Sequence, residues 1–183
     1  LHMTGGVNIA TDPDRWNQIK AGWATFQAIG VKTARLMSSD EVSEITAGVV
    51  KTSDVLGGLY DDNEGYLDPH GTTHAYAGAA KNRGADVILR NRVVELNQRK
   101  DGSWDVVTEK GTIHCEHIVN AGGLWAKQVG LMANVDLPVT PMEHHYLVTE
   151  PFEPLNALEG ELPTIVDLDG FTYTRQERDG LLM

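Results

Sequence analysis

The sequence predicts a mixed α+β and α/β fold in which two lobes are interleaved along the chain. A capped amphipathic helix begins at Asp12-Pro13, and short strands with hairpin turns follow one another between residues 93 and 117. The β-branched pair Ile118-Val119 then runs into a turn of small residues, Ala121-Gly122-Gly123. A buried strand that ends in such a turn lets the backbone approach a large flat ligand closely. Together these features predict a sheet-based lobe interleaved with a lobe of the dinucleotide-binding type.

The helices are predicted from capping residues and from apolar residues at helical spacing. Asp12 followed by Pro13 starts the first helix, whose aromatic and aliphatic positions recur every three to four residues until Gly30 ends it. This stripe indicates packing against a core rather than a ligand site. Further helices are expected at residues 39–46, 68–83 and 124–133.

The strands are predicted from short β-branched and aromatic runs that are bounded by turn residues. Asp101-Gly102 is a strong hairpin signal, and Lys110-Gly111 marks the next turn of a three-stranded meander. Alternation over residues 139–149 predicts one long strand. The other expected strands are residues 7–10, 56–60, 87–89, 93–96, 104–109, 112–117, 118–119, 164–166 and 171–174.

Composition and charge disfavour several classes of partner. The 183 residues are 41% hydrophobic and 22% charged, and the net charge is −11. Nucleic acids and anionic membrane surfaces need basic faces, whereas an acidic chain suits a cationic substrate. No apolar run approaches the roughly 20 residues of a membrane span, and no signal peptide opens the chain, so we expect a cytoplasmic protein. The single cysteine, Cys115, is expected in the core without a disulfide.

Several common site motifs are absent. No glycine is followed by another glycine two residues later, so the chain has no G-x-G-x-x-G turn to cradle a pyrophosphate. No G-x-S-x-G nucleophile turn occurs either. His70 and His74 share a helix face and resemble half of a zinc site, but Gly71 stands where a metalloprotease has Glu and no third ligand is evident. We therefore expect no metal site.

Six groups of residues, each weak alone, occur in a specific order along the chain. They are GGVNIA at 5–10 with DR at 14–15, LGGLY at 56–60 with GYLDP at 65–69, NAGGLWA at 120–126, PVTPMEHHY at 138–146, YTRQE at 173–177 and GLL at 180–182. In this order they resemble the FAD-dependent dimethylglycine and sarcosine dehydrogenases, a D-amino-acid-oxidase-like flavoprotein family. The resemblance covers nearly the whole chain from Thr4.

The resemblance implies a substrate-binding lobe with a mixed sheet, interleaved with part of a FAD-binding, Rossmann-like lobe that lacks its first βαβ unit. Residues 4–80 and 138–183 would belong to the substrate lobe, and residues 81–137, with the meander, to the FAD lobe. The chain is therefore expected to be a central fragment, in which residues 1–3 are a cloning remnant. Without the pyrophosphate turn, we expect this fragment to bind FAD weakly or not at all and to be inactive by itself.

The resemblance also indicates the residues that would contact an amine substrate. His144 is the expected proton acceptor for a secondary or tertiary amine, because histidine side chains exchange protons near neutral pH. Tyr146, two residues along the predicted strand, would share its face, whereas His145 would point away. Tyr173 is the second catalytic candidate, and Arg175 would pair with a substrate carboxylate. Ordinary strand residues on a solvated face are the competing interpretation.

On the cofactor side, the resemblance places Val94 beside the adenine and Ala121, Gly122 and Trp125 along the flavin. A closely packed crossover between elements would use the same small residues, so that interpretation stays open.

The expected function is oxidation of an N-methyl amino acid, dimethylglycine or sarcosine, by hydride transfer to FAD. One alternative is a non-catalytic module that binds a small amine or carboxylate, or that forms a homodimer through apolar surface. Another is a flavoenzyme that oxidises D-amino acids or glycerol phosphate, although Glu143-His144-His145-Tyr146 favours the N-methylglycine branch. For a eukaryotic parent, the compartment would be the mitochondrial matrix.

Overall fold

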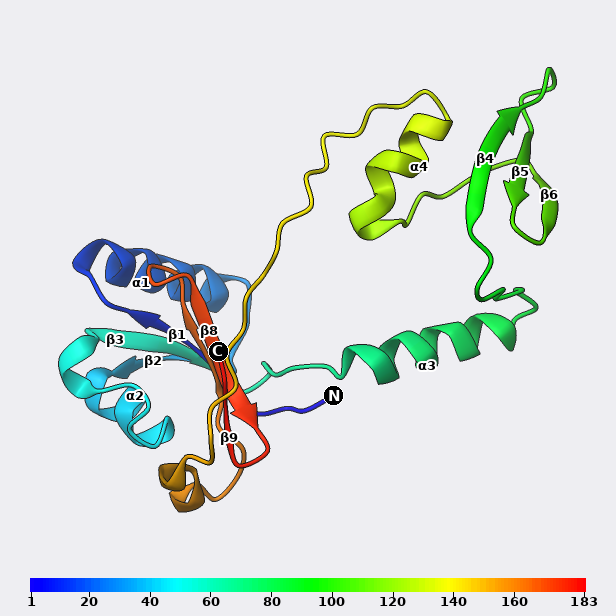
Figure 1. Cartoon of the computed structure of the whole chain (residues 1–183). Helices are drawn as coiled ribbons and strands as arrows, with labels where there is room; N and C mark the ends of the chain where they lie inside the picture. Colours follow the sequence, from blue (N-terminus) through cyan, green and yellow to red (C-terminus); the bar gives the residue numbers. More distant parts are fainter. The chain divides into compact units, whose positions relative to one another are not determined.

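The computed structural model describes all 183 residues and divides the chain into two compact units (Figure 1). Unit 1 consists of residues 1–73 and 145–183, and unit 2 consists of residues 74–144. The chain therefore forms part of unit 1, then all of unit 2, and then completes unit 1. The lobe roles and boundaries inferred from the sequence, at residues 80 and 138, stay predictions.

Unit 1 is built on a six-stranded mixed sheet. Its strand order is β2-β3-β1-β7-β8-β9, in which β1 and β7 run parallel and all other neighbours run antiparallel. The pairing of β1 with β7 joins the two stretches of chain that make up this unit. The mixed sheet with its helices confirms the predicted α/β character. The strands are β1 (Gly6–Ala10), β2 (Ala34–Ser38), β3 (Gly57–Asp61), β7 (Thr164–Asp167), β8 (Thr172–Glu177) and β9 (Gly180–Leu182).

Two capped helices lie against this sheet. In α1 (Pro13–Ala28), the Asp12 carboxylate accepts hydrogen bonds from two backbone N–H groups of the first turn, at 2.8 and 3.0 Å. In α2 (Ser39–Ile45), Ser38 and Glu41 form a capping box. These side chains satisfy backbone donors that would otherwise lack partners at the helix start. Two short 3-10 turns complete the unit, η1 (Thr52–Asp54) and η3 (Glu153–Ala157).

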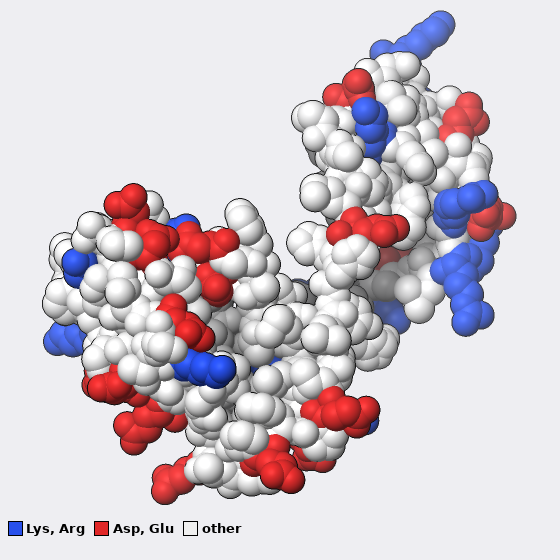
Figure 2. Space-filling model, turned by 60° about the vertical axis from the view of Figure 1, so that its left-hand side comes forward, with Lys and Arg blue, Asp and Glu red and all other residues white.

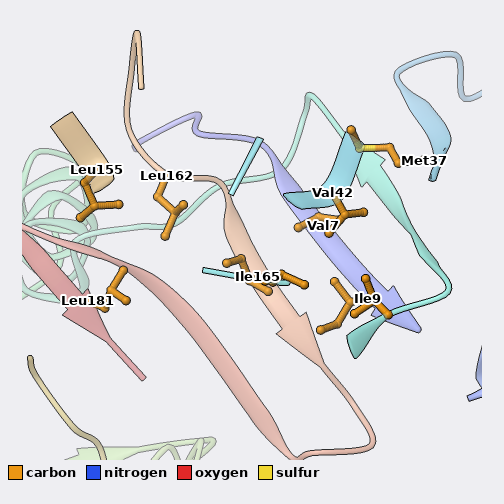
Figure 3. Packing of buried hydrophobic residues seen from close by; sticks show 10 residues of the cluster. Val7, Ile9, Met37, Val42, Leu155, Leu162, Ile165 and Leu181 are labelled. Atoms are coloured by element: carbon orange, nitrogen blue, oxygen red, sulfur yellow. The ribbon is translucent and has the colours of Figure 1, made fainter. Parts of the chain in front are cut away.

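The apolar core lies on both faces of the sheet, but it covers them unequally. One face carries a cluster that extends from β2 to β9 (Figure 3), formed by Val7, Ile9, Met37, Val42, Val50, Val55, Leu155, Leu162, Ile165 and Leu181. On the other face α1 packs on β1, β2 and β3, through Ile19, Trp16, Trp23 and Phe26 against Ala10, Ala34, Leu36 and Leu59. The aromatic stripe of α1 is therefore core, as predicted. Over β7, β8 and β9 no helix packs extensively on this second face, and Arg15 of α1 contacts only Asp169 in the turn between β7 and β8.

Unit 2 contains a small antiparallel sheet and a short helix. The sheet is the predicted meander of β4 (Val93–Gln98), β5 (Trp104–Thr108) and β6 (Gly111–Cys115). α4 (Ala126–Met132) follows the 3-10 turn η2 (Gly123–Trp125) and contacts β4. The helix α3 (Pro69–Lys81) begins in unit 1 and ends in unit 2. No helix of the molecule is long and apolar enough to cross a membrane.

Three predicted strands are absent. Residues 87–89 and 118–119 are not strands, and Val119 is exposed. Residues 139–146 have no ladder partner, and pairing begins only at Leu147, whose N–H donates to the Met183 carbonyl at 2.8 Å. Alternation and β-branching make a strand possible, but a strand forms only where another backbone accepts its hydrogen bonds.

Two further expectations were wrong. Cys115 is only partly buried, because it ends the outer strand of the meander rather than lying in a core. The first residues take part in the fold, since the backbone of His2 exchanges hydrogen bonds of 2.9 and 3.0 Å with the backbone of Tyr66. Leaving residues 1–3 out of the fold was therefore wrong, while their origin as a cloning remnant stays a prediction.

Candidate functional site

A row of residues crosses the half of the sheet that α1 leaves open. Gly6 on β1 pairs with Thr164 on β7, and the β7–β8 register, continued by one residue, sets Thr164 opposite Arg175. Arg175 in turn pairs with Leu182 on β9. Because side chains alternate along a strand, this row faces the same side as Ala10, which packs under α1. The adjacent row contains Asn8, Val166 and Tyr173.

Arg175 is held in position by three contacts. Its guanidinium lies 2.8 Å from Glu177 Oε2, donates to the Gln176 carbonyl at 3.0 Å, and lies 4.7 Å from the centre of the Tyr66 ring. A guanidinium has five N–H donors, so these contacts leave donors for another carboxylate. Tyr173, two residues earlier, faces the same side and is 57% exposed. The structure therefore brings these two predicted site residues together on the open face.

Tyr66 contacts Arg175 and is itself held by His2 and Glu161, a role that sequence reasoning did not predict. Its ring stacks on the His2 imidazole with centroids 4.7 Å apart, and its hydroxyl donates to Glu161 at 3.1 Å. The same carboxylate lies 3.3 Å from His2 Nδ1. Burial and the bond to Glu161 raise the pKa of the Tyr66 hydroxyl. Tyr66 therefore stays a neutral donor, and its ring gives Arg175 a fixed aromatic surface.

Glu64 is a carboxylate on the same open face that sequence reasoning also missed. A Cβ added to Gly6 would collide with the Glu64 carboxyl group, so this group lies over Gly6 in the row described above. Burial raises the pKa of Glu64, and the charge of Asp61 raises it further. No hydrogen bond or ion pair contributes to this shift. Glu64 is thus a half-buried carboxyl group without a partner.

His144 and Tyr146 do not share a strand face, because no strand forms at these positions. His144 is exposed and is the last residue of unit 2, whereas Tyr146 belongs to unit 1 and is 73% exposed. Tyr146 borders a cavity of about 550 Å³ with Val148 and Leu182 and with the turn that joins β8 to β9. The structure therefore places Tyr146 at the edge of the open face, and the chemical roles of both residues stay predictions.

Three of the four predicted cofactor residues border one cavity in unit 2. Val94 on β4, Gly122 in the turn and Trp125 on η2 line a space of about 470 Å³ between β4 and α4. Ala121 is exposed and does not line this space. The other residues around the cavity are Arg92, Val93, Gln128, Val129 and Met132.

The turn beside this cavity is shaped by Asn120. Its side-chain oxygen accepts the N–H of Gly122 at 3.1 Å, and its side-chain nitrogen donates to the Ala126 carbonyl at 2.8 Å. A Cβ at Gly122 would lie only 3.0 Å from the Asn120 oxygen, and Gly123 has a φ of 53°. Both positions therefore favour glycine.

The residues around this cavity fit the ring systems of FAD. Val94, Trp125 and Met132 offer apolar surface to a flat ring, and the glycine turn brings backbone close without side-chain bulk. Arg92 adds a positive charge at the edge, which suits a phosphate group. Trp125 is 62% exposed, so its ring is accessible to a ligand.

The two units differ sharply in charge. Unit 2 contains eight Lys and Arg and eight Asp and Glu residues, so the whole net charge of −11 is carried by unit 1. Acidic side chains are accordingly prominent on the visible surface (Figure 2). No group of three or more His, Cys, Asp or Glu residues is arranged to hold a metal ion.

Comparisons with known proteins identify the family. The family model described as FAD dependent oxidoreductase matches residues 1–183. Human mitochondrial dimethylglycine dehydrogenase is 37% identical over 187 residues, which cover 100% of this chain and 21% of that protein. Mouse mitochondrial sarcosine dehydrogenase is 33% identical over 184 residues, covering 98% of this chain and 19% of that protein. The chain thus spans about a fifth of the length of these relatives.

A solved structure shows the same fold. L-proline dehydrogenase from P. horikoshii superposes with a TM-score of 0.82 over 99% of this chain and 48% of that protein, at 24% sequence identity. Because the family model covers every residue and the relatives match from end to end, this chain belongs to the family of FAD-dependent oxidoreductases.

Proposed function

We propose that this chain forms part of an enzyme that oxidises an N-methyl amino acid, dimethylglycine or sarcosine, with FAD as the electron acceptor. The observation that carries the proposal is that Tyr173 and Arg175 lie two residues apart on β8 and face the same, open side of the unit 1 sheet. The names of the relatives supply the substrate class. In this proposal unit 1 is the substrate lobe and unit 2 is the part of the FAD lobe that the chain contains.

Each residue has a distinct role in this proposal. Arg175 binds the substrate carboxylate, and Tyr66 fixes the plane of its guanidinium. The Tyr173 hydroxyl donates a hydrogen bond to the bound substrate and helps to control its protonation. Tyr146 borders the entrance of the substrate site. His144 accepts the ammonium proton, which leaves a lone pair on nitrogen.

The cofactor has its place in unit 2. Val94, Gly122 and Trp125 hold its rings, while Ala121 contributes backbone to the same turn. FAD, when bound, supplies the two-electron acceptor for the N-methyl or N-methylene carbon. The proposed location is the mitochondrial matrix for a eukaryotic source and the cytoplasm for a bacterial one. The support for the first is that the human and mouse relatives are named as mitochondrial.

The test uses the complete gene product that contains this chain, purified with FAD. Anaerobic addition of dimethylglycine or sarcosine should bleach the flavin absorbance near 450 nm, while glycine and glycerol 3-phosphate should bleach it far more slowly. Rapid reduction by glycerol 3-phosphate or a D-amino acid, without reduction by either N-methyl amino acid, would overturn the proposal.

A second candidate is a non-catalytic module that associates with itself. The observation that favours it is the exposed apolar surface of unit 2, where Val119 is 89% exposed and Leu124 and Trp125 are also exposed. Exposed apolar side chains that gather into a patch are commonly covered by a partner or a ligand. Sedimentation velocity with and without FAD, together with the flavin-reduction test, separates the module from the enzyme. A homodimer that persists when FAD is added, and whose flavin no amine reduces, would support the module.

A further inference from the structure

Two polar groups on the open face of unit 1 have no partner. The Glu64 carboxyl group lies over Gly6, is partly buried, and receives no hydrogen bond. The Thr164 hydroxyl oxygen is buried and is likewise unpaired. Buried polar groups are nearly always hydrogen-bonded in folded proteins. The Thr164 oxygen is such an exception, and the partly buried Glu64 carboxyl group lies over the neighbouring position of the sheet. Together they indicate a place where a polar ligand completes the structure.

The sheet register aligns these groups with Arg175. Gly6, which Glu64 overlies, pairs with Thr164, and Thr164 stands opposite Arg175. Neighbouring strands lie about 4.8 Å apart, so β1 and β8 are separated by roughly 10 Å across this row. The Glu64 carboxyl group lies over Gly6 on β1 and Arg175 belongs to β8, while Thr164 lies on β7, the strand between them. A small zwitterion bound across this row would meet a carboxyl group at one end and a guanidinium at the other.

The electrostatics call for a cation at Glu64 rather than an anion. Burial and the neighbouring charge of Asp61 both disfavour the ionised form of Glu64, and no Lys or Arg contributes to offset them. The Asp61 carboxylate itself accepts the N–H of Asn63 at 2.9 Å within the turn. An ammonium group placed here would pair with the carboxylate and remove the cost of its isolation. The acidic character of unit 1 favours the same sign of ligand.

We propose that Glu64 binds the substituted ammonium group of the substrate, with the Thr164 hydroxyl beside it, while Arg175 binds the carboxylate at the other end of the row. Glu64 is then the residue that distinguishes an amino acid from an uncharged carboxylic acid of the same shape. This inference rests on the proposed function, because it names how the substrate amine is recognised.

The experiment compares two ligands of nearly identical shape. Dimethylglycine carries a protonated nitrogen where isovalerate, its carbon isostere, carries an uncharged CH. Their affinities for the oxidised, FAD-loaded complete gene product are measured from the perturbation of the flavin spectrum under anaerobic conditions, extrapolated to zero time for dimethylglycine. Glu64→Gln should weaken dimethylglycine binding about tenfold to a hundredfold, as expected for loss of a charge-assisted hydrogen bond. The affinity for isovalerate should stay within about twofold.

Matched variants separate recognition from structure. Glu64→Asp keeps the charge on a shorter side chain and should retain part of the preference for dimethylglycine. Thr164→Val should lower the affinity for dimethylglycine more than that for isovalerate. Glu44→Gln removes one carboxylate from the exposed surface of α2 and should leave both affinities unchanged.

The outcomes distinguish this inference from the proposed function. If the wild-type protein neither binds nor oxidises dimethylglycine, both the proposed function and the inference that rests on it are wrong. If the wild type binds dimethylglycine and Glu64→Gln binds it equally well, the inference alone is wrong. Equal weakening of dimethylglycine and isovalerate by Glu64→Gln also overturns it, because that result indicates a structural role.

Discussion

The two units of this chain bury their apolar residues to very different degrees. Unit 1 has clusters on both faces of its sheet, and Val7, Val42 and Leu162 are completely buried. Unit 2 has one buried apolar side chain of any size, Leu96, while Trp125 and many other apolar residues are exposed. Burial of apolar surface is the main favourable term in folding, so the stability of the chain is concentrated in unit 1.

Charge follows the same division. Unit 1 carries the entire net charge, whereas unit 2 is neutral overall. An acidic unit with an open polar face suits a cationic amine, and a neutral unit with an exposed apolar cavity does not repel an anionic dinucleotide. This difference in charge agrees with the proposal that unit 1 binds the substrate and unit 2 binds the cofactor rings.

Replacement of Tyr173 by Phe is expected to give the largest effect, and this effect should be confined to the reaction of the substrate. In the complete, FAD-loaded gene product, Tyr173→Phe should lower the rate of flavin reduction about 10² to 10⁴-fold, the range seen for groups that assist proton transfer. The FAD content should stay unchanged, because Tyr173 lies in unit 1. Stopped-flow absorbance gives the rate and the spectrum gives the FAD content. Tyr76→Phe, an exposed tyrosine on α3, is the control. Loss of FAD in Tyr173→Phe would contradict the proposal that unit 1 binds only the substrate and unit 2 binds the cofactor.

A pair of core variants tests the difference in stability. Leu162→Ala removes a fully buried side chain from the cluster on unit 1 and should cost about 2–5 kcal/mol in the free energy of unfolding. Ile113→Ala on β6, where the side chain is half exposed, should cost less than about 1 kcal/mol. Urea unfolding followed by circular dichroism measures both. Equal costs would mean that unit 2 contributes a core of its own.

Much of unit 1 could be predicted from local sequence signals. Asp12-Pro13 and Ser39-Asp40-Glu41 mark helix starts, because capping depends on neighbours in the sequence. β2 was missed because its run of Ala34 to Ser38 has no β-branched residue, and it becomes a strand only by pairing with β3. The opposite error occurred over residues 139–146, where the alternation is present but no partner strand is.

The candidate site divides in the same way between local and distant signals. Tyr173 and Arg175 share a face because they are two residues apart on one strand, which is local information. Glu64 and Thr164 come to neighbouring positions only through the pairing of β1 with β7, whose residues lie more than a hundred positions apart. The Gly5-Gly6 pair at the start of β1 was the one available signal, since glycine in a strand often marks close approach of another group.

Variants around the cavity of unit 2 should have a smaller effect, and it should fall on the cofactor alone. Trp125→Ala removes an exposed aromatic ring from the cavity wall, and the lost stacking should weaken FAD binding about twofold to tenfold. Gly122→Ala places a methyl group 3.0 Å from the Asn120 oxygen and should act in the same direction. Fluorescence titration of the apoprotein with FAD measures both effects. The affinity of the FAD-reloaded enzyme for isovalerate should be unchanged. An equal loss of affinity for isovalerate would contradict the proposed separation of substrate and cofactor binding between the two units.

The smallest expected effect concerns the pH dependence of stability in unit 1. Because burial and Asp61 raise the pKa of Glu64 in the folded state, the folded protein holds this proton more tightly than the unfolded chain does. The resulting stabilisation is fully present below the ordinary glutamate pKa of about 4.3 and is lost as the pH rises through the folded value.

Glu64→Gln removes this titration. The variant should therefore be more stable than the wild type at pH 7, by less than the cost of Leu162→Ala, and the difference should shrink as the pH falls toward 4. Thermal unfolding in the absence of substrate, at a series of pH values, measures the difference, and Glu44→Gln on α2 is the control. A Glu64→Gln protein that is less stable at pH 7 would show that the carboxylate is needed by the fold. Glu64 would then stabilise the fold, and the open face of unit 1 would not be a binding site for a cationic ligand.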